Sequence, residues 1–145
     1  MGARVAALGL DVGRKRVGIA GCDGLGLLAT GLMTLHRRSF AQDLEVFRQI
    51  VQERQVEVLV VGLPYRWDGS QGSQAHYTQA YGQRLGRALG LPVVYVDERC
   101  TSAAAIDLIH GEGRSPGHQK GLIDRKAAAI ILQQWLDERR GVAAP

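Results

Sequence analysis

Acidic residues stand at three places in this chain where a reactive site is expected. Asp11 ends an apolar run, and the pair Asp97 and Glu98 ends a second one. In open sheets, sites gather at the carboxyl ends of parallel strands, so we expect these acids to share one crevice. Asp124, in the first turn of the last predicted helix, would join them. Carboxylates brought together repel unless cations neutralise them, and hard oxygen ligands favour Mg²⁺ or Mn²⁺.

Each acid also has a structural explanation. Asp124 could complement a helix dipole, and Asp97 or Glu98 could cap a helix or pair with Arg99. Asp11, which is followed by a glycine and a basic turn, is the hardest to explain in this way. Adjacent residues on a strand point to opposite faces, so only one of Asp97 and Glu98 is expected to be a ligand. Glu98 has the longer side chain and is the favoured ligand, whereas Asp97 could fix the position of the loop.

The elements that must position these acids follow from the hydrophobic pattern. Strands are predicted at 5–11, 17–22, 27–35, 56–62 and 92–97, and helices at 40–55, 74–89, 103–110 and 122–140. Ser39 is the predicted N-cap of the first helix, Thr101 or Ser102 that of the third, and Gly90 ends the second. The glycine-rich segment Gly111–Gly121 is predicted to be a mobile loop. The order β-β-β-α-β-α-β-α-α predicts a single α/β domain over 1–145, with an antiparallel meander joined to parallel strands and flanked by helices.

Composition limits the function. The 145 residues carry a formal net charge of +4 with a sequence pI of about 9.4, and fifteen of the eighteen basic residues are arginines. Guanidinium groups bind phosphate through a bidentate fork, so this charge suits a nucleic-acid partner, although many proteins reach +4 without one. No apolar stretch approaches the ~20 residues that span a bilayer, and the opening residues do not resemble a signal peptide. We therefore expect a cytoplasmic protein.

Other polar groups carry weaker signals. Arg66, Trp67 and Ser70 follow a buried strand and could touch phosphate and a stacked base, although the same segment could be a simple turn around Pro64. Two cysteines make neither a disulfide framework nor a paired zinc site. The four histidines show no metal-ligand spacing, and no Ser/His/Asp or Cys/His arrangement is recognisable.

Four ordered motifs resemble those of the YqgF family, also called RuvX or Holliday-junction-resolvase-like proteins. They are LGLDVGRKRVGIA, VVGLPYRWDGS, VDERCTSAAA and IDRKAAAIILQQWL, and the likeness covers almost the whole chain. The resemblance implies an RNase H-like fold and a nuclease that acts in maturation of the 5′ end of 16S rRNA. A role as a Holliday-junction resolvase on branched DNA, proposed for some members, is the alternative, and it would require a homodimer with two active sites.

The resemblance also assigns residues. The family's acids match Asp11, Glu98 and Asp124 as catalytic metal ligands. The implied mechanism is phosphodiester hydrolysis with two Mg²⁺ or Mn²⁺ ions roughly 4 Å apart, bridged by Asp11. Candidates for phosphate contacts are Arg14, Lys15, Arg16 and Lys120, in addition to Arg66. One departure is that Ala103-Ala104-Ala105 stands where the family usually has an acid, which puts any substrate contact of that acid in doubt.

Two other classes of protein remain open. GLDVGRKRVG is also similar to the first phosphate loop of actin- and sugar-kinase-like ATPases, but those proteins need two such domains and a second glycine-rich motif. A nucleic-acid-binding protein without catalytic activity is the other possibility. The presence of all three carboxylates argues against it.

Overall fold

The computed structural model describes residues 4–64, 72–97 and 116–141, with the backbone alone for 116–121. At its centre is a five-stranded sheet with the strand order β3-β2-β1-β4-β5. The strands are β1 (Ala7–Val12), β2 (Arg16–Cys22), β3 (Ala29–His36), β4 (Val58–Leu63) and β5 (Val93–Asp97). Each strand overlaps one of the five apolar runs, which confirms the predicted strands.

The sheet is mixed, as predicted. β1, β2 and β3 form an antiparallel meander, in which Asp11 lies opposite Gly18 and Arg16 lies opposite His36. β4 pairs parallel with β1, and β5 pairs parallel with β4. The carboxyl ends of β1, β4 and β5 therefore meet at one edge of the sheet, where a site is expected.

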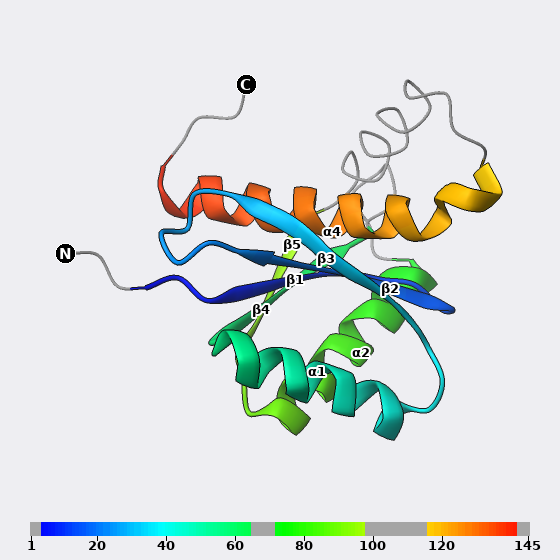
Figure 1. The fold of residues 1–145 in the computed structure, drawn as a ribbon. Helices are drawn as coiled ribbons and strands as arrows, with labels where there is room; N and C mark the ends of the chain where they lie inside the picture. The colour runs from blue at the N-terminus through cyan, green and yellow to red at the C-terminus, as the bar shows by residue number, and fades with distance from the viewer. Residues whose placement is uncertain (1–3, 65–71, 98–115, 142–145) are drawn as a thin grey trace.

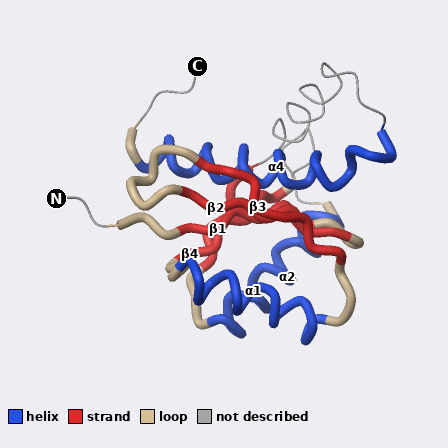
Figure 2. The backbone as a smooth tube through the Cα atoms, viewed as in Figure 1, coloured by secondary structure: helices blue, strands red, loops and turns tan. Residues whose placement is uncertain are grey.

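Helices cover both faces of this sheet (Figure 1). α1 (Phe40–Arg54) and α2 (Ser73–Leu89) pack on one face, and α4 (Pro116–Arg139) crosses the other. Figure 2 shows the strands in red between these two helical layers. We call the two sides of the sheet the α1/α2 face and the α4 face.

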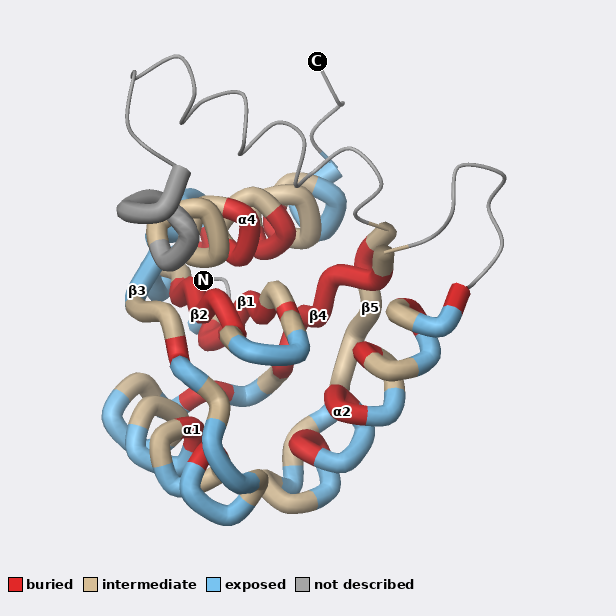
Figure 3. Tube along the Cα trace, turned by 90° about the vertical axis from the view of Figure 1, so that its right-hand side faces the viewer, coloured by how far each residue is buried: buried red, intermediate tan, exposed pale blue. Residues whose placement is uncertain are grey.

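Two apolar clusters fill the layers, and the buried positions line the strands between the helices (Figure 3). The cluster on the α1/α2 face contains large side chains, including Leu8, Leu10, Ile19, Phe47 and Leu85. The cluster on the α4 face is built on smaller strand residues, including Ala7, Ala20 and Val60, against Ala128 and Leu132 of the helix.

Local sequence explains where the first two helices begin and end. The Ser39 side chain accepts a hydrogen bond from the backbone N–H of Gln42, whose side chain bonds back to the N-cap backbone, so a full capping box starts α1. α2 ends at Gly90, which has φ of 69° and closes the helix in the left-handed region that glycine adopts without strain. Both boundaries confirm the predictions.

The last helix begins earlier than predicted. α4 starts at Pro116, so the part of the predicted mobile loop from 116 to 121 is helical. Proline suits the first helical position, because its φ angle is already helical and its missing N–H would have no partner there. Asp124 consequently lies more than two turns inside α4 rather than in its first turn, which rules out the helix-dipole explanation for this acid. The helix predicted at 103–110 lies outside the described residues.

Within the described part of the chain, no helix is long and apolar enough to cross a membrane.

Candidate active site

Asp11 lies near the carboxyl end of β1 and is half-buried. A side chain added at Gly9 would meet Leu132 of α4, so the alternation of the strand also places Asp11 on the α4 face. Leu8, Leu10 and Val12 point the other way, into the large-residue cluster. The predicted catalytic acid is therefore on a strand that is fixed by packing on both sides.

Gly18, which lies opposite Asp11 on β2, lets α4 approach the sheet. A Cβ atom added at Gly18 would lie 2.0 Å from the backbone oxygen of Asp124. No real side chain tolerates that distance, so the backbone of α4 sits directly on this glycine. Asp11 and Asp124 are thereby brought to the same face of the sheet, one strand apart.

The carboxylate of Asp124 already has a cationic partner. Arg16 Nε donates a hydrogen bond to Asp124 Oδ2 at 2.7 Å. The side chains are 28% and 17% exposed, so this charge-assisted bond is partly shielded from solvent. Arg16, predicted to contact phosphate, thus ties the start of β2 to α4.

The remaining predicted site residues are placed only in part. Asp97 ends β5 on the α1/α2 face, because it follows Tyr95 by two positions and pairs in register with Leu63. It lies on the face opposite to Asp11. Glu98 and Arg66 lie outside the described residues, and for Lys120 only the helical backbone in α4 is described.

The basic turn between β1 and β2 is exposed at Arg14 and Lys15. Its backbone is held from two directions. Gly13 N–H donates to Arg16 O at 2.8 Å, and Arg37 N–H donates to Lys15 O at 2.9 Å. The turn that follows Asp11 is therefore fixed to the connection between β3 and α1.

Sequence reasoning missed the residue at the centre of this arrangement, Arg37. Its guanidinium donates to Gly13 O at 3.0 Å and to the hydroxyl of Tyr77, and it lies 4.5 Å from the ring centroid of Tyr81. Asp43, a buried acid on α1, is 3.9 Å from Arg37 Nε. Arg37 and Arg38 are adjacent in the sequence, and nothing local distinguishes the two arginines.

Burial changes the chemistry of one residue of this group. Removal from water raises the pKa of Tyr81 to about 12, and the nearby Arg37 guanidinium opposes that rise. The Tyr81 hydroxyl has no hydrogen-bond partner among the described residues. Tyr81 is consequently a neutral ring against which the arginine stacks.

The chemistry of the donors fits a hard divalent cation. Asp11 and Asp124 supply carboxylate oxygens from one face of the sheet, which are the ligands that Mg²⁺ and Mn²⁺ prefer. No three potential ligands gather within the ranges that the structure describes, and the third predicted acid, Glu98, falls outside them.

Comparison with protein families gives a match over residues 5–138 to a family described as "RuvX: Holliday junction resolvase". The chain belongs to the RuvX family. Relatives in this family share most of the sequence. The "Putative pre-16S rRNA nuclease" of Synechococcus elongatus is 62% identical over 135 residues, which cover 93% of this chain and 91% of that protein. A protein of the same name from Gloeothece citriformis is 59% identical over 139 residues, covering 96% and 92% of the two chains.

Solved structures support the fold of this RuvX protein. Thermus thermophilus RuvC in complex with a Holliday junction substrate superposes with a TM-score of 0.56 at 16% identity, covering 97% of this chain and 99% of that one. A second Thermus thermophilus RuvC structure gives a TM-score of 0.55 at 15% identity, with the same coverage. The fold is therefore RNase H-like, as the sequence motifs implied. The family match and the relatives named as nucleases show that the protein is a hydrolase of a nuclease family.

Proposed function

We propose that this RuvX protein hydrolyses phosphodiester bonds of precursor 16S rRNA at the 5′ end, using divalent metal ions. One observation carries the proposal: the backbone of Asp124 rests on Gly18, a glycine that has no room for a side chain and that pairs across the strands with Asp11, so two acids far apart in sequence lie on the α4 face. Nucleases of the RuvX and RuvC type depend in general on a divalent metal. The curated relatives named above supply the candidate substrate.

The proposed roles follow the placement of the residues. Asp11, Glu98 and Asp124 would hold Mg²⁺ or Mn²⁺. Asp97, on the opposite face of β5, is the poorer candidate ligand, which supports the choice of Glu98. When bound, such a metal pair supplies an activated water and stabilises the leaving oxygen.

Basic residues would bind the substrate phosphates around this centre. Arg14 and Lys15 are exposed on the turn that follows Asp11, and Arg16 lies against Asp124. Arg16 neutralises this carboxylate and thereby lowers the repulsion between the acids. Arg66 and Lys120 are also proposed to contact substrate phosphates.

The second candidate function is cleavage of Holliday junctions. The family's description and the RuvC complex with junction DNA favour it. A resolvase makes two cuts and would need a homodimer, whereas processing of one RNA strand would not. Either function would be carried out in the cytoplasm.

A cleavage assay separates the candidates. The protein is offered a precursor 16S rRNA fragment and a four-way DNA junction side by side, with Mg²⁺, Mn²⁺ or EDTA. We expect cleavage of the RNA that requires metal and falls at least about a hundredfold in Asp11→Asn, since even supporting residues of a metal site cost 10- to 100-fold. Glu45→Gln, an exposed acid on α1, is the matched control.

Thermal melts provide a second measurement. A divalent ion that binds only the folded state raises the melting temperature, and Asp11→Asn should lose most of that rise. The variant should melt no lower than its parent in EDTA, because one repelling charge has gone. A variant that melts well below the parent in EDTA and keeps the full metal response would make Asp11 a structural residue.

A further inference from the structure

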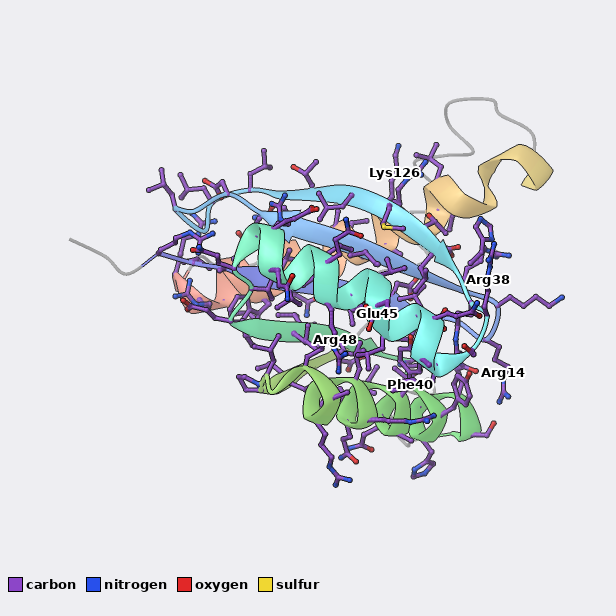
Figure 4. The ribbon with its side chains drawn as sticks, turned by 60° about the horizontal axis from the view of Figure 1, so that its bottom comes forward. Arg14, Arg38, Phe40, Glu45, Arg48 and Lys126 are labelled. Atoms are coloured by element: carbon purple, nitrogen blue, oxygen red, sulfur yellow. The ribbon has the colours of Figure 1, made fainter. Side chains whose placement is uncertain are left out.

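Two adjacent arginines, Arg37 and Arg38, lie beside the basic turn but differ in exposure. Arg38 is exposed, whereas the Arg37 side chain is only 18% exposed. Figure 4 shows Arg38 and Arg14 at the same end of α1, with Arg48 farther along that helix. The backbone bond from Arg37 N–H to Lys15 O makes the two segments neighbours. We call the exposed cations Arg14, Lys15 and Arg38 the basic edge.

Arg37 is the residue that holds the basic edge together. Its guanidinium binds the carbonyl oxygens of Gly13 at 3.0 Å and Arg14 at 3.5 Å, both in the turn. The same nitrogen, Nη1, also donates to the hydroxyl of Tyr77 on α2, and the guanidinium lies 4.5 Å from the ring centroid of Tyr81. One planar cation thus connects the β1–β2 turn to α2.

Asp43 fixes the same junction from α1. Its carboxylate, 3.9 Å from Arg37 Nε, also accepts the backbone N–H of Arg38 at 3.1 Å. The residue is 2% exposed, so the position of Arg38 is set by a buried group. A lysine in place of Arg37 would keep the charge but would lose the planar group beside the Tyr77 and Tyr81 rings and the Nε that faces Asp43.

The aromatic rings near the basic edge are already used by arginines. Arg14 lies 4.6 Å from the ring centroid of Tyr77, and Arg37 lies 5.5 Å from it. Arg84 lies 3.8 Å from the centroid of Phe40. Binding of single strands relies on stacking of bases on aromatic side chains as well as on charge. The described part of this edge instead offers cations beside rings that arginines cover, which suits contact with a phosphate backbone.

We propose that the basic edge binds the phosphates of a double-helical segment of the substrate, and that Arg37 is the positioning residue that holds Arg14 and Lys15 for this contact. The turn follows Asp11 by two residues, so the bound duplex would run from the candidate active site onto the start of α1. This inference rests on the proposed nuclease function. It adds Arg38 as a phosphate contact and gives Arg37 a role that requires no contact with substrate.

Salt dependence of binding tests the contact by Arg38. Binding of a short DNA duplex is measured in EDTA over a series of salt concentrations, so that no cleavage occurs. Each lost phosphate contact lowers the log–log slope by about 0.9 on B-DNA. We expect this loss in Arg38→Ala, about twice this loss in the double variant Arg14→Ala/Lys15→Ala, and none in the control Arg48→Ala, which removes an exposed arginine of α1. An Arg38→Ala slope equal to that of the control would overturn the contact.

Arg37→Lys tests positioning at constant net charge. We expect its slope to fall toward that of the Arg14→Ala/Lys15→Ala variant, although no charge has been removed. A folded Arg37→Lys protein with the parent's slope would overturn the positioning role. Tyr77→Leu, which removes the ring between Arg14 and Arg37, is the second variant if Arg37→Lys does not fold, and the same slope loss is expected.

Two further measurements identify the partner and separate this inference from the proposed function. A single strand of equal length should bind more weakly than the duplex, and equal or tighter binding would overturn the preference for a double helix. Metal-dependent cleavage by the parent protein is measured in parallel. Cleavage with unchanged slopes in all the variants would refute the basic edge alone, whereas slope losses without any cleavage would refute the nuclease proposal and leave a binding surface.

Discussion

The two faces of the sheet are built from side chains of different size. On the α1/α2 face, Leu8, Leu10 and Ile19 meet Phe47 and Leu85, and all five are fully buried. On the α4 face, the strands present alanine, glycine and valine, and the helix backbone approaches so closely that a methyl group at Gly18 or Gly9 has no room. Burial of the large side chains on the α1/α2 face stabilises the fold.

The α4 face is suited to fixing the position of the helix backbone accurately. Where a helix rests on glycine, its distance from the sheet is set by direct contact of main-chain atoms rather than by side chains that can change rotamer. The acids Asp11 and Asp124 are both on this face. We conclude that the α1/α2 face mainly stabilises the fold and that the α4 face mainly sets the geometry of the candidate site.

Leu85→Ala tests the stabilising role of the α1/α2 face and should have the largest effect on stability. The side chain is fully buried, so its truncation should lower the free energy of unfolding by about 2–5 kcal/mol, measured by urea denaturation. Cleavage per folded molecule should stay near that of the parent, because α2 is not on the α4 face. Leu25→Ala, at a leucine that is 76% exposed, is the control for loss of the same atoms.

Gly18→Ala tests the geometric role of the α4 face. The added methyl would meet the Asp124 carbonyl, so α4 must move outward, at a cost of about 1–3 kcal/mol. Cleavage per folded molecule should fall steeply, because Asp124 moves away from Asp11. The control is Gly24→Ala, where the nearest atom is 3.8 Å away.

The pair of variants can contradict the division between the two faces. If Gly18→Ala retains full cleavage while Leu85→Ala loses it at equal folded concentration, the site depends on the α1/α2 face instead. Circular dichroism and the unfolding curves establish the folded fraction in each case.

Tyr81→Phe should have the smallest effect at neutral pH. The ring remains for Arg37 to stack on, and a buried hydroxyl without a described partner is removed, so the change in stability should be within about 0.5 kcal/mol. Tyr95→Phe is the contrast, because it loses the hydrogen bond that its hydroxyl donates to Gln79 O at 3.1 Å.

Alkaline pH should separate the stability of the parent from that of Tyr81→Phe. The pKa of Tyr81 rises from 10.0 to about 12 in the folded protein, so the unfolded chain releases its proton first. The stability that this residue contributes is intact below pH 10 and is lost as the pH rises toward about 12. Urea midpoints measured across this range should therefore fall less in Tyr81→Phe than in the parent, and an equal fall would place Tyr81 in contact with solvent.

Much of the fold could be predicted because its signals are local. The five apolar runs and the Ser39 cap each lie within a few residues of the element that they define. The predicted start of the last helix is wrong because the glycines around Pro116 favour a loop in a sequence-based prediction. In the structure, proline at the first helical position and packing on the sheet extend the helix to Pro116.

The contacts that define the site could not be predicted because they join distant parts of the chain. Arg16 and Asp124 are 108 residues apart, and Arg37 reaches Tyr77 across 40 residues. Nothing near Gly18 in the sequence indicates that a helix backbone will rest on it. The sequence motifs named the acids Asp11 and Asp124, but only the fold shows that Arg16 neutralises one of them.

The distance in sequence between Arg16 and Asp124 also has a consequence for the order of events during synthesis. Chains emerge from the ribosome N-terminus first, so Asp11 and the basic turn exist well before α4 does. Until α4 docks, Asp124 is missing from the site and one face of the sheet is uncovered. A nascent chain of this protein therefore carries the cations proposed to bind phosphate before it carries the full set of proposed metal ligands, and on the proposed mechanism cutting would begin only after α4 has folded.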